Sequence, residues 1–225
     1  MTGVFGVDLL SGLNLGTMVC YIAAFTVIVA SLIALTQDGL KRRLAFSTIG
    51  QLSYIVLGVA LLSPKGMTGG LTHIAMHAFG KITLFFCAGA IFVATGKKYI
   101  SEMTGIGKRM PVTMFAFFIG SLSVIGLPPT GGFFSKWYLV LGTLESGQTA
   151  MLVILLISSM LNAAYFLPIV YRAFFCSPDR AMFGDTIQEA PLWCVVPPVI
   201  TAAASVFLFF YPTLFLRLAE LAIGL

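Results

Sequence analysis

The sequence predicts an all-α integral membrane protein, a bundle of about six transmembrane helices. Of its 225 residues 59% are hydrophobic and only 9% are charged, and the mean hydropathy is +1.01. A soluble domain carries roughly 25% charged residues, so this surface is built to contact lipid. The apolar runs are near the roughly 20 residues of a membrane-spanning helix, and they are too long and too little alternating for barrel strands.

Six spans follow one another, and the whole chain, 1–225, is expected to form a single transmembrane domain. Turn and charged residues gather in the connections at 37–43, 63–69, 96–111, 145–148 and 176–191. Between these lie the expected spans at 15–36, 44–62, 70–95, 112–144, 149–175 and 192–211.

The connections also predict the orientation of the bundle. One side of the membrane holds nine basic residues in connections or near span ends: Lys41, Arg42, Arg43, Lys97, Lys98, Lys108, Arg109, Arg172 and Arg180. The other side holds only Lys65 and Arg217. Basic loops stay in the cytoplasm, so we expect a multi-pass protein of the cell (inner) membrane with both termini outside. No basic stripe interleaves with aromatics, so the bilayer and not nucleic acid is the expected partner of these charges.

Two basic residues, Lys81 and Lys136, lie inside spans. All eight acidic residues fall in loops, near span ends or near the termini, so neither lysine has a carboxylate at its own depth in this chain. An ionisable residue at membrane depth costs roughly 2.5–3.5 kcal/mol on insertion scales, which makes it a functional candidate.

The third span stacks three titratable side chains on one face. His73, His77 and Lys81 are four residues apart in turn, which is the spacing of neighbours along a helix. Histidine titrates near neutral pH, and burial disfavours the charged amine, so the three could pass protons. The alternative is that they only hydrogen-bond to neighbouring helices. A lone histidine would favour that interpretation, whereas the stacked trio favours function.

The fourth span cannot be one straight helix. Proline removes amide donors and glycine loosens the turn, and the break is expected at Pro128, Pro129, Gly131 and Gly132. Irregular backbone at membrane depth is tolerated only against protein or a water-filled cavity, and broken helices mark ion pathways in transporters. Lys136 then lies in the first turn of the second half-helix. The alternative is an ordinary proline kink with Lys136 snorkelling to one interface, which lies about 13 Å away along the helix at the loop near Glu145.

The fifth span carries weaker signals. Pro168 predicts a second kink, and Asn162 and Tyr165 lie about one turn before it. Polar residues at such places more often serve helix packing than a site.

No metal or cofactor is expected in this chain. Paired histidines four residues apart can bind zinc, but a third ligand and a nearby carboxylate are lacking. Only two histidines are present, and the four cysteines (Cys20, Cys87, Cys176 and Cys194) lie far apart. Redox chemistry would therefore belong to partner proteins.

Three stretches carry a resemblance to a known family. They are 41–54 (KRRLAFSTIGQLSY), 73–81 (HIAMHAFGK) and 126–136 (GLPPTGGFFSK). In this order they resemble the proton-conducting membrane transporter family, which includes the antiporter-like subunits of respiratory complex I, of membrane-bound hydrogenases and of multisubunit sodium/proton antiporters. The chain looks most similar to the D-type antiporter subunit, and the resemblance runs essentially from end to end.

The resemblance implies a role for each candidate residue. The lysine at the position of Lys81 is a central proton-relay residue in the family, with the histidines in the same chain. The residue at the position of Lys136 lies on a broken helix and connects the relay to one side of the membrane. Family members resemble two inverted five-helix repeats plus flanking helices, and this chain matches only the second half. We therefore expect a fragment or one half of a split subunit.

The expected function is proton translocation within a larger membrane complex, with other membrane subunits as partners. Three alternatives stay open: a subunit of a redox-driven proton pump, a subunit of a sodium/proton antiporter, and a non-conducting structural fragment. The chain is at most a subunit of a proton-pumping oxidoreductase, since it implies no redox chemistry of its own.

Overall fold

The structure is a computed structural model, and it describes residues 6–176 and 187–224. Arg180, which the orientation argument counts, lies outside the described residues. The helices are α2 (Val7–Gly12), α3 (Leu15–Thr36), α4 (Leu40–Ala60), α5 (Pro64–Thr95), η1 (Ile100–Met103), α6 (Ile106–Arg109), α7 (Pro111–Ile125), α8 (Gly132–Glu145), α9 (Thr149–Phe175), α10 (Leu192–Phe210) and α11 (Thr213–Ala222).

The predicted fold class is confirmed. In the described part of the chain, α3, α4, α5, α9 and α10 are long and apolar enough to cross a membrane, and α7 is a shorter apolar helix. The bounds of α3 and α9 are those expected from the sequence. The third span was expected to begin at residue 70, but α5 begins at Pro64, because the Ser63 hydroxyl accepts the Gly66 amide (3.1 Å) and proline suits a first helical turn.

The fourth span is broken where the sequence predicts. Helix α7 ends at Ile125, Gly126 follows with φ 89°, and α8 begins at Gly132. In the intervening segment the Gly131 amide donates to Ser205 O of α10 over 2.9 Å. A Cβ on Gly132 would lie 1.9 Å from Ser123 O, so only glycine fits there.

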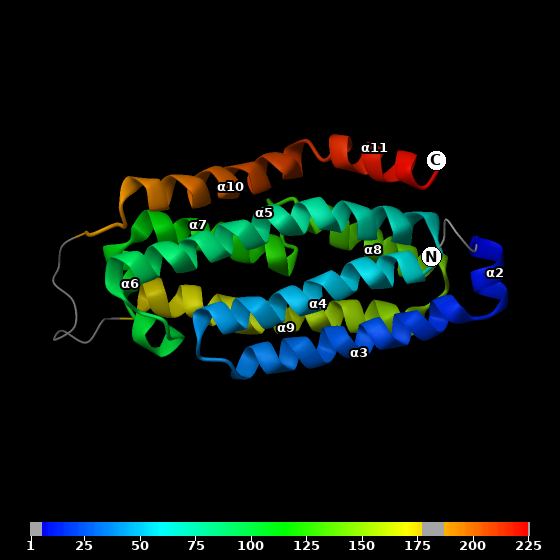
Figure 1. Cartoon of the computed structure of the whole chain (residues 1–225), viewed down its shortest axis with the longest axis horizontal. Coiled ribbons are helices and arrows are strands. Elements are labelled where there is room, and N and C mark those ends of the chain that lie inside the picture. The colour runs from blue at the N-terminus through cyan, green and yellow to red at the C-terminus, as the bar shows by residue number, and fades with distance from the viewer. Residues whose placement is uncertain (1–5, 177–186, 225) are drawn as a thin grey trace.

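The long helices run antiparallel, and the basic connections gather at one end of the bundle (Figure 1). Backbone hydrogen bonds tie these connections together: Leu40 N donates to Lys98 O, and Gly105 N donates to Arg172 O. Lys65 lies at the opposite end, where its amide donates to Glu145 Oε2 over 3.1 Å.

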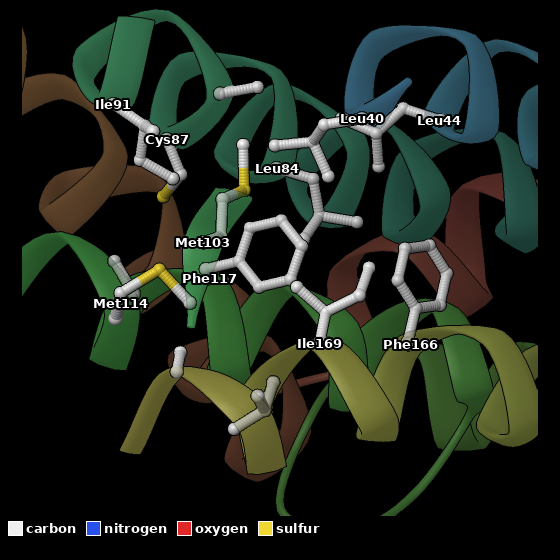
Figure 2. Packing of buried hydrophobic residues seen from close by; sticks show 14 of the residues in the cluster. Leu40, Leu44, Leu84, Cys87, Ile91, Met103, Met114, Phe117, Phe166 and Ile169 are labelled. Atoms are coloured by element: carbon white, nitrogen blue, oxygen red, sulfur yellow. The ribbon is translucent and has the colours of Figure 1, made fainter. Parts of the chain in front are cut away.

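Two apolar clusters form the core. One includes Leu44, Leu84, Phe117 and Phe166, which Figure 2 shows packed between α4, α5, α7 and α9. The other lies among α3, α4, α8 and α9 and includes Leu57. Along α4 and α9 these clusters are separated by buried polar residues, so a polar layer crosses the middle of the bundle.

Glycines bring α5 close to α8. A Cβ on Gly142 would lie 2.3 Å from Gly66 Cα, and one on Gly69 would lie 2.7 Å from Leu139 N. Small residues allow transmembrane helices this close approach, which places Ser135 in the first turn of α8 beside His73 of α5.

Candidate functional site

Lys81 of α5 is buried and points toward the start of α4. Its Nζ donates to Leu44 O (3.1 Å) and to Ser47 Oγ (2.7 Å), and it lies 5.6 Å from the centroid of the Phe166 ring. An ammonium group has three donors, so a carbonyl, a hydroxyl and an aromatic face together satisfy it.

The Ser47 oxygen also connects Lys81 to α9. The Tyr165 hydroxyl lies 2.9 Å from Ser47 Oγ and also contacts Asn162 Oδ1, so it can donate to either. From their spacing, Asn162 and Tyr165 were expected to serve helix packing. In the structure they extend the polar surroundings of Lys81 by two side chains.

His73 bridges three helices. Its Nδ1 lies 2.8 Å from Ser135 Oγ of α8, and its Nε2 lies 3.2 Å from Gln51 Oε1 of α4. Ser135 donates to Gly132 O (3.0 Å), so His73 Nδ1 donates to Ser135. When Nε2 also carries a proton, it donates to the Gln51 oxygen; when the ring is neutral, Nε2 accepts from the Gln51 amide nitrogen, which requires a flip of the amide.

His77 lies between His73 and Lys81 on the same helical face. The two imidazole rings stack with centroids 5.5 Å apart and an interplanar angle of 20°. Among the described residues, His77 Nδ1 has no hydrogen-bond partner, although the ring is buried. The three side chains therefore lie along one face of α5, as their spacing predicts.

Lys136 caps the end of the broken helix. Its Nζ donates to Ile125 O, the last carbonyl of α7 (2.8 Å), and to Ser159 Oγ of α9 (3.3 Å). It also lies 4.9 Å from the centroid of the Tyr54 ring. A cation is favourable at a helix C-terminus. The alternative of a lysine extended to the interface is not what is found, since Lys136 is only 9% exposed.

Tyr54 links the two lysine environments. Its ring centroid lies 5.6 Å from that of His73, and its hydroxyl donates to Ser158 Oγ of α9 over 2.6 Å. Contacts therefore run from Lys136 through Tyr54 and His73 to His77, and Lys81 follows one helical turn further along α5.

Sequence reasoning missed the hydroxyl and amide groups of this layer: Ser47, Gln51, Tyr54, Ser135 and Ser158. A signal was present in the spacing. Positions 47, 51 and 54 of α4, like 158, 162 and 165 of α9, are separated by four and then three residues, which places each set on one helical face.

The donor set does not suit a metal. Within residues 6–176 and 187–224, no group of three or more histidine, cysteine, aspartate or glutamate side chains comes together. Lys81 and Lys136 contact carbonyls, hydroxyls and aromatic rings instead.

The fold and the site define a class: a multi-pass α-helical membrane protein with one broken span and a buried layer of lysines and histidines. The chain belongs to the NADH:quinone oxidoreductase/Mrp antiporter transmembrane family, whose model matches residues 3–162. The membership of this family inferred from the three sequence stretches is thereby confirmed.

Curated relatives come from redox complexes. Subunit N of the NADH-quinone oxidoreductase of Desulforudis audaxviator is 46% identical over 154 residues, covering 68% of this chain and 31% of that protein. Component B of hydrogenase-4 of Escherichia coli is 33% identical over 235 residues, covering 91% of this chain and 35% of that protein. The chain therefore spans less than half the length of either relative.

Solved structures share the fold. The Mrp complex of a Dietzia species contains a chain that matches with a TM-score of 0.84 at 24% identity, covering 91% of this chain and 46% of that one. A chain of an archaeal membrane-bound sulfane sulfur reductase matches with a TM-score of 0.83 at 28% identity, covering 93% and 42%. These neighbours belong to multisubunit membrane complexes.

Proposed function

We propose that this chain translocates protons as part of a larger membrane complex, as a D-type cation/proton antiporter subunit or a complex I-like subunit in the cell membrane. It would correspond to the second helix repeat and the last helix of such a subunit. One observation carries the proposal: Lys81 and Lys136 are each met by one carbonyl, one hydroxyl and one aromatic face.

These surroundings suit an amine that gains and loses a proton. A carboxylate partner would hold the lysine in its charged form, whereas carbonyl and hydroxyl oxygens also accept hydrogen bonds from a neutral amine. Lys81 and Lys136 can therefore alternate between the two forms without breaking an ion pair.

The histidines supply the intermediate positions of the relay. His73 contacts Ser135 and Gln51 through opposite ring nitrogens, and His77 stacks on it in the direction of Lys81. Protons would move between Lys136 and Lys81 through these rings, with water molecules bridging the remaining gaps. The break at Pro128, Pro129, Gly131 and Gly132 would open the route from Lys136 toward one side of the membrane.

The test replaces Lys81 with methionine in the intact complex in its own membranes. We expect Lys81→Met to abolish proton flux, because methionine keeps the length of the side chain and removes the titrating group. Flux is measured with a pH-sensitive dye in sealed vesicles, and assembly by the amount of complex recovered. Lys65→Met is the matched control, since Lys65 is exposed at one end of the bundle. Wild-type flux in Lys81→Met would overturn the assignment.

The partners and the coupling ion separate the alternatives. Co-purification with iron–sulfur subunits would indicate a redox-driven pump, whereas only small membrane partners would indicate an antiporter. Sodium-dependent proton movement without any electron donor would also favour the antiporter. Normal flux with both Lys81 and Lys136 replaced would favour a non-conducting structural fragment.

A further inference from the structure

A second feature, a largely apolar cavity with basic residues in its lining, is found at the basic end of the bundle, away from the buried lysines. A cavity of about 260 Å³ opens there between the start of α4, the end of α5 and the connection that follows α5. Its lining combines cationic and apolar side chains: Lys41, Arg42, Lys97, Lys98, Phe92 and Met103.

Hydrogen bonds between two connections brace this cavity. Leu40 N donates to Lys98 O (3.0 Å) and Ile100 N donates to Asp38 O (2.8 Å), so the two segments are paired on either side of the bridge between Gly39 and Tyr99. The basic residues that line the cavity therefore extend from two backbone segments that are hydrogen-bonded to each other.

The acidic residues near the cavity accept hydrogen bonds from other groups. Asp38 accepts from the amide and hydroxyl of Ser101 (3.0 and 2.7 Å), and Glu102 accepts from the amides of Lys98 and Tyr99 (3.3 and 3.2 Å). Neither carboxylate forms an ion pair with Lys41 or Lys98 in the part of the chain that the structure describes.

The two lysines instead flank one exposed aromatic ring. Lys41 Nζ lies 5.3 Å and Lys98 Nζ 5.2 Å from the centroid of Phe92. Two cations on one ring repel each other. Burial among these groups also lowers the pKa of Lys97, with Glu102 opposing and Arg109 adding to the shift. An anion in the cavity would relieve this repulsion.

The surface below the cavity is apolar. Lys41 begins a stripe on one face of α4 that continues through Ala45, Ile49, Leu52 and Val56 at spacings of four, four, three and four residues. All four apolar members are exposed, and the last three are 46–50% exposed. A ligand that fits both the basic cavity and the apolar stripe is thus an amphiphile with an anionic end.

We propose that this cavity binds the phosphate of an anionic phospholipid, with an acyl chain lying along the α4 stripe. Basic pockets between transmembrane helices bind anionic headgroups through the same chemistry. The proposal goes beyond proton translocation and does not depend on it.

The experiment uses the intact complex with photoactivatable lipids whose diazirine lies on an acyl chain. Vesicles of phosphatidylethanolamine contain either a phosphatidylglycerol probe or a phosphatidylethanolamine probe, and crosslinked peptides are mapped by mass spectrometry. We expect the anionic probe to label α4 near Ala45 and Ile49. Labelling should fall roughly tenfold or more in the double variant Lys41→Gln/Lys98→Gln, since each lysine near anionic lipid contributes roughly fivefold in affinity.

Matched variants separate the cavity from general surface charge. Lys108→Gln removes an exposed lysine that does not line the cavity, and it should leave labelling unchanged. Lys41→Arg/Lys98→Arg should restore the labelling. Equal labelling by both probes, equal loss in Lys108→Gln, or complete displacement by inorganic phosphate would each overturn the proposal, the last by indicating a site for a free anion.

Discussion

Ser47 is a single hydroxyl on which much of the candidate relay depends. Its oxygen accepts from Lys81 and lies within hydrogen-bonding distance of the Tyr165 hydroxyl, so it joins α4, α5 and α9. Hydrogen bonds to charged groups contribute about 1.5–3 kcal/mol, more than neutral ones. Losing this oxygen would leave Lys81 with the Leu44 carbonyl and the Phe166 ring.

We expect Ser47→Ala to lower proton flux roughly tenfold, which is less than the loss in Lys81→Met. A change of about 1.4 kcal/mol in the stability of the protonated lysine corresponds to a factor of ten in rate. The measurement is dye-monitored flux in sealed vesicles at equal amounts of complex.

Ser53→Ala is the control for this change. Ser53 is also buried on α4, but its hydroxyl donates only to Ile49 O of its own helix (3.0 Å). Flux in Ser53→Ala should stay within about twofold of wild type. Equal flux in the two serine variants would show that Ser47 takes no part in the relay.

At the scale of the elements, the broken span depends on glycines that no other residue can replace. Gly126 adopts a left-handed conformation, and a Cβ there would lie 2.5 Å from Lys136 Cδ. Gly132 packs against the Ser123 carbonyl of α7. The break therefore accommodates the Lys136 side chain and returns α8 against α5.

We expect Gly132→Ala to destabilise the protein by about 1–3 kcal/mol or more, because the clash is with backbone that cannot rotate away. Gly89→Ala on α5 is the matched control: no atom lies within 4 Å of its added Cβ, and alanine favours helix by about 0.5–1 kcal/mol. Thermal unfolding of the purified complex measures both. A melting temperature unchanged in Gly132→Ala would contradict this description of the break.

Arg43 joins three of the long helices. Its guanidinium donates to Gln37 O (2.9 Å), Leu35 O (3.2 Å) and Tyr165 O (3.0 Å), which lie at the end of α3 and in α9. From the sequence, Arg43 was expected in the basic connection at 37–43. It lies instead inside α4, which begins at Leu40. Its hydrogen bond to Tyr165 O fixes the backbone of Tyr165, whose hydroxyl lies within hydrogen-bonding distance of Ser47.

At the scale of the whole molecule, the asymmetric charge predicts an orientation. The basic connections meet at one end of the bundle, while the start of α5, which carries Lys65, lies at the other (Figure 1). We expect Lys108→Cys to face the cytoplasm and Lys65→Cys to face outside. A membrane-impermeant maleimide added to intact cells should label only Lys65→Cys, and added to inverted vesicles only Lys108→Cys.

Native thiols set the background of that experiment. Cys20 and Cys87 are buried, and Cys176 and Cys194 are partly exposed, so the last two are changed to serine in every variant. Labelling of Lys108→Cys from outside the cell would show that the protein has the opposite orientation in the membrane.

Composition and spacing determined the membrane class, the bounds of α3 and α9, and the broken fourth span. These follow from local physics: lipid requires apolar helices of a certain length, and proline removes amide donors wherever it lies. The same reasoning placed His73, His77 and Lys81 on one face, because a helix of known period orders side chains four residues apart.

Only the tertiary structure decided what those side chains contact. Ser47 is 34 residues from Lys81, and Tyr165 is 118 residues from Ser47. Which hydroxyl meets which amine depends on how closely α4, α5, α8 and α9 pack, and that closeness is set by glycines whose partners lie on other helices. Sequence by itself therefore identified the buried charges, and packing across the bundle supplied the carbonyls, hydroxyls and rings that hold them.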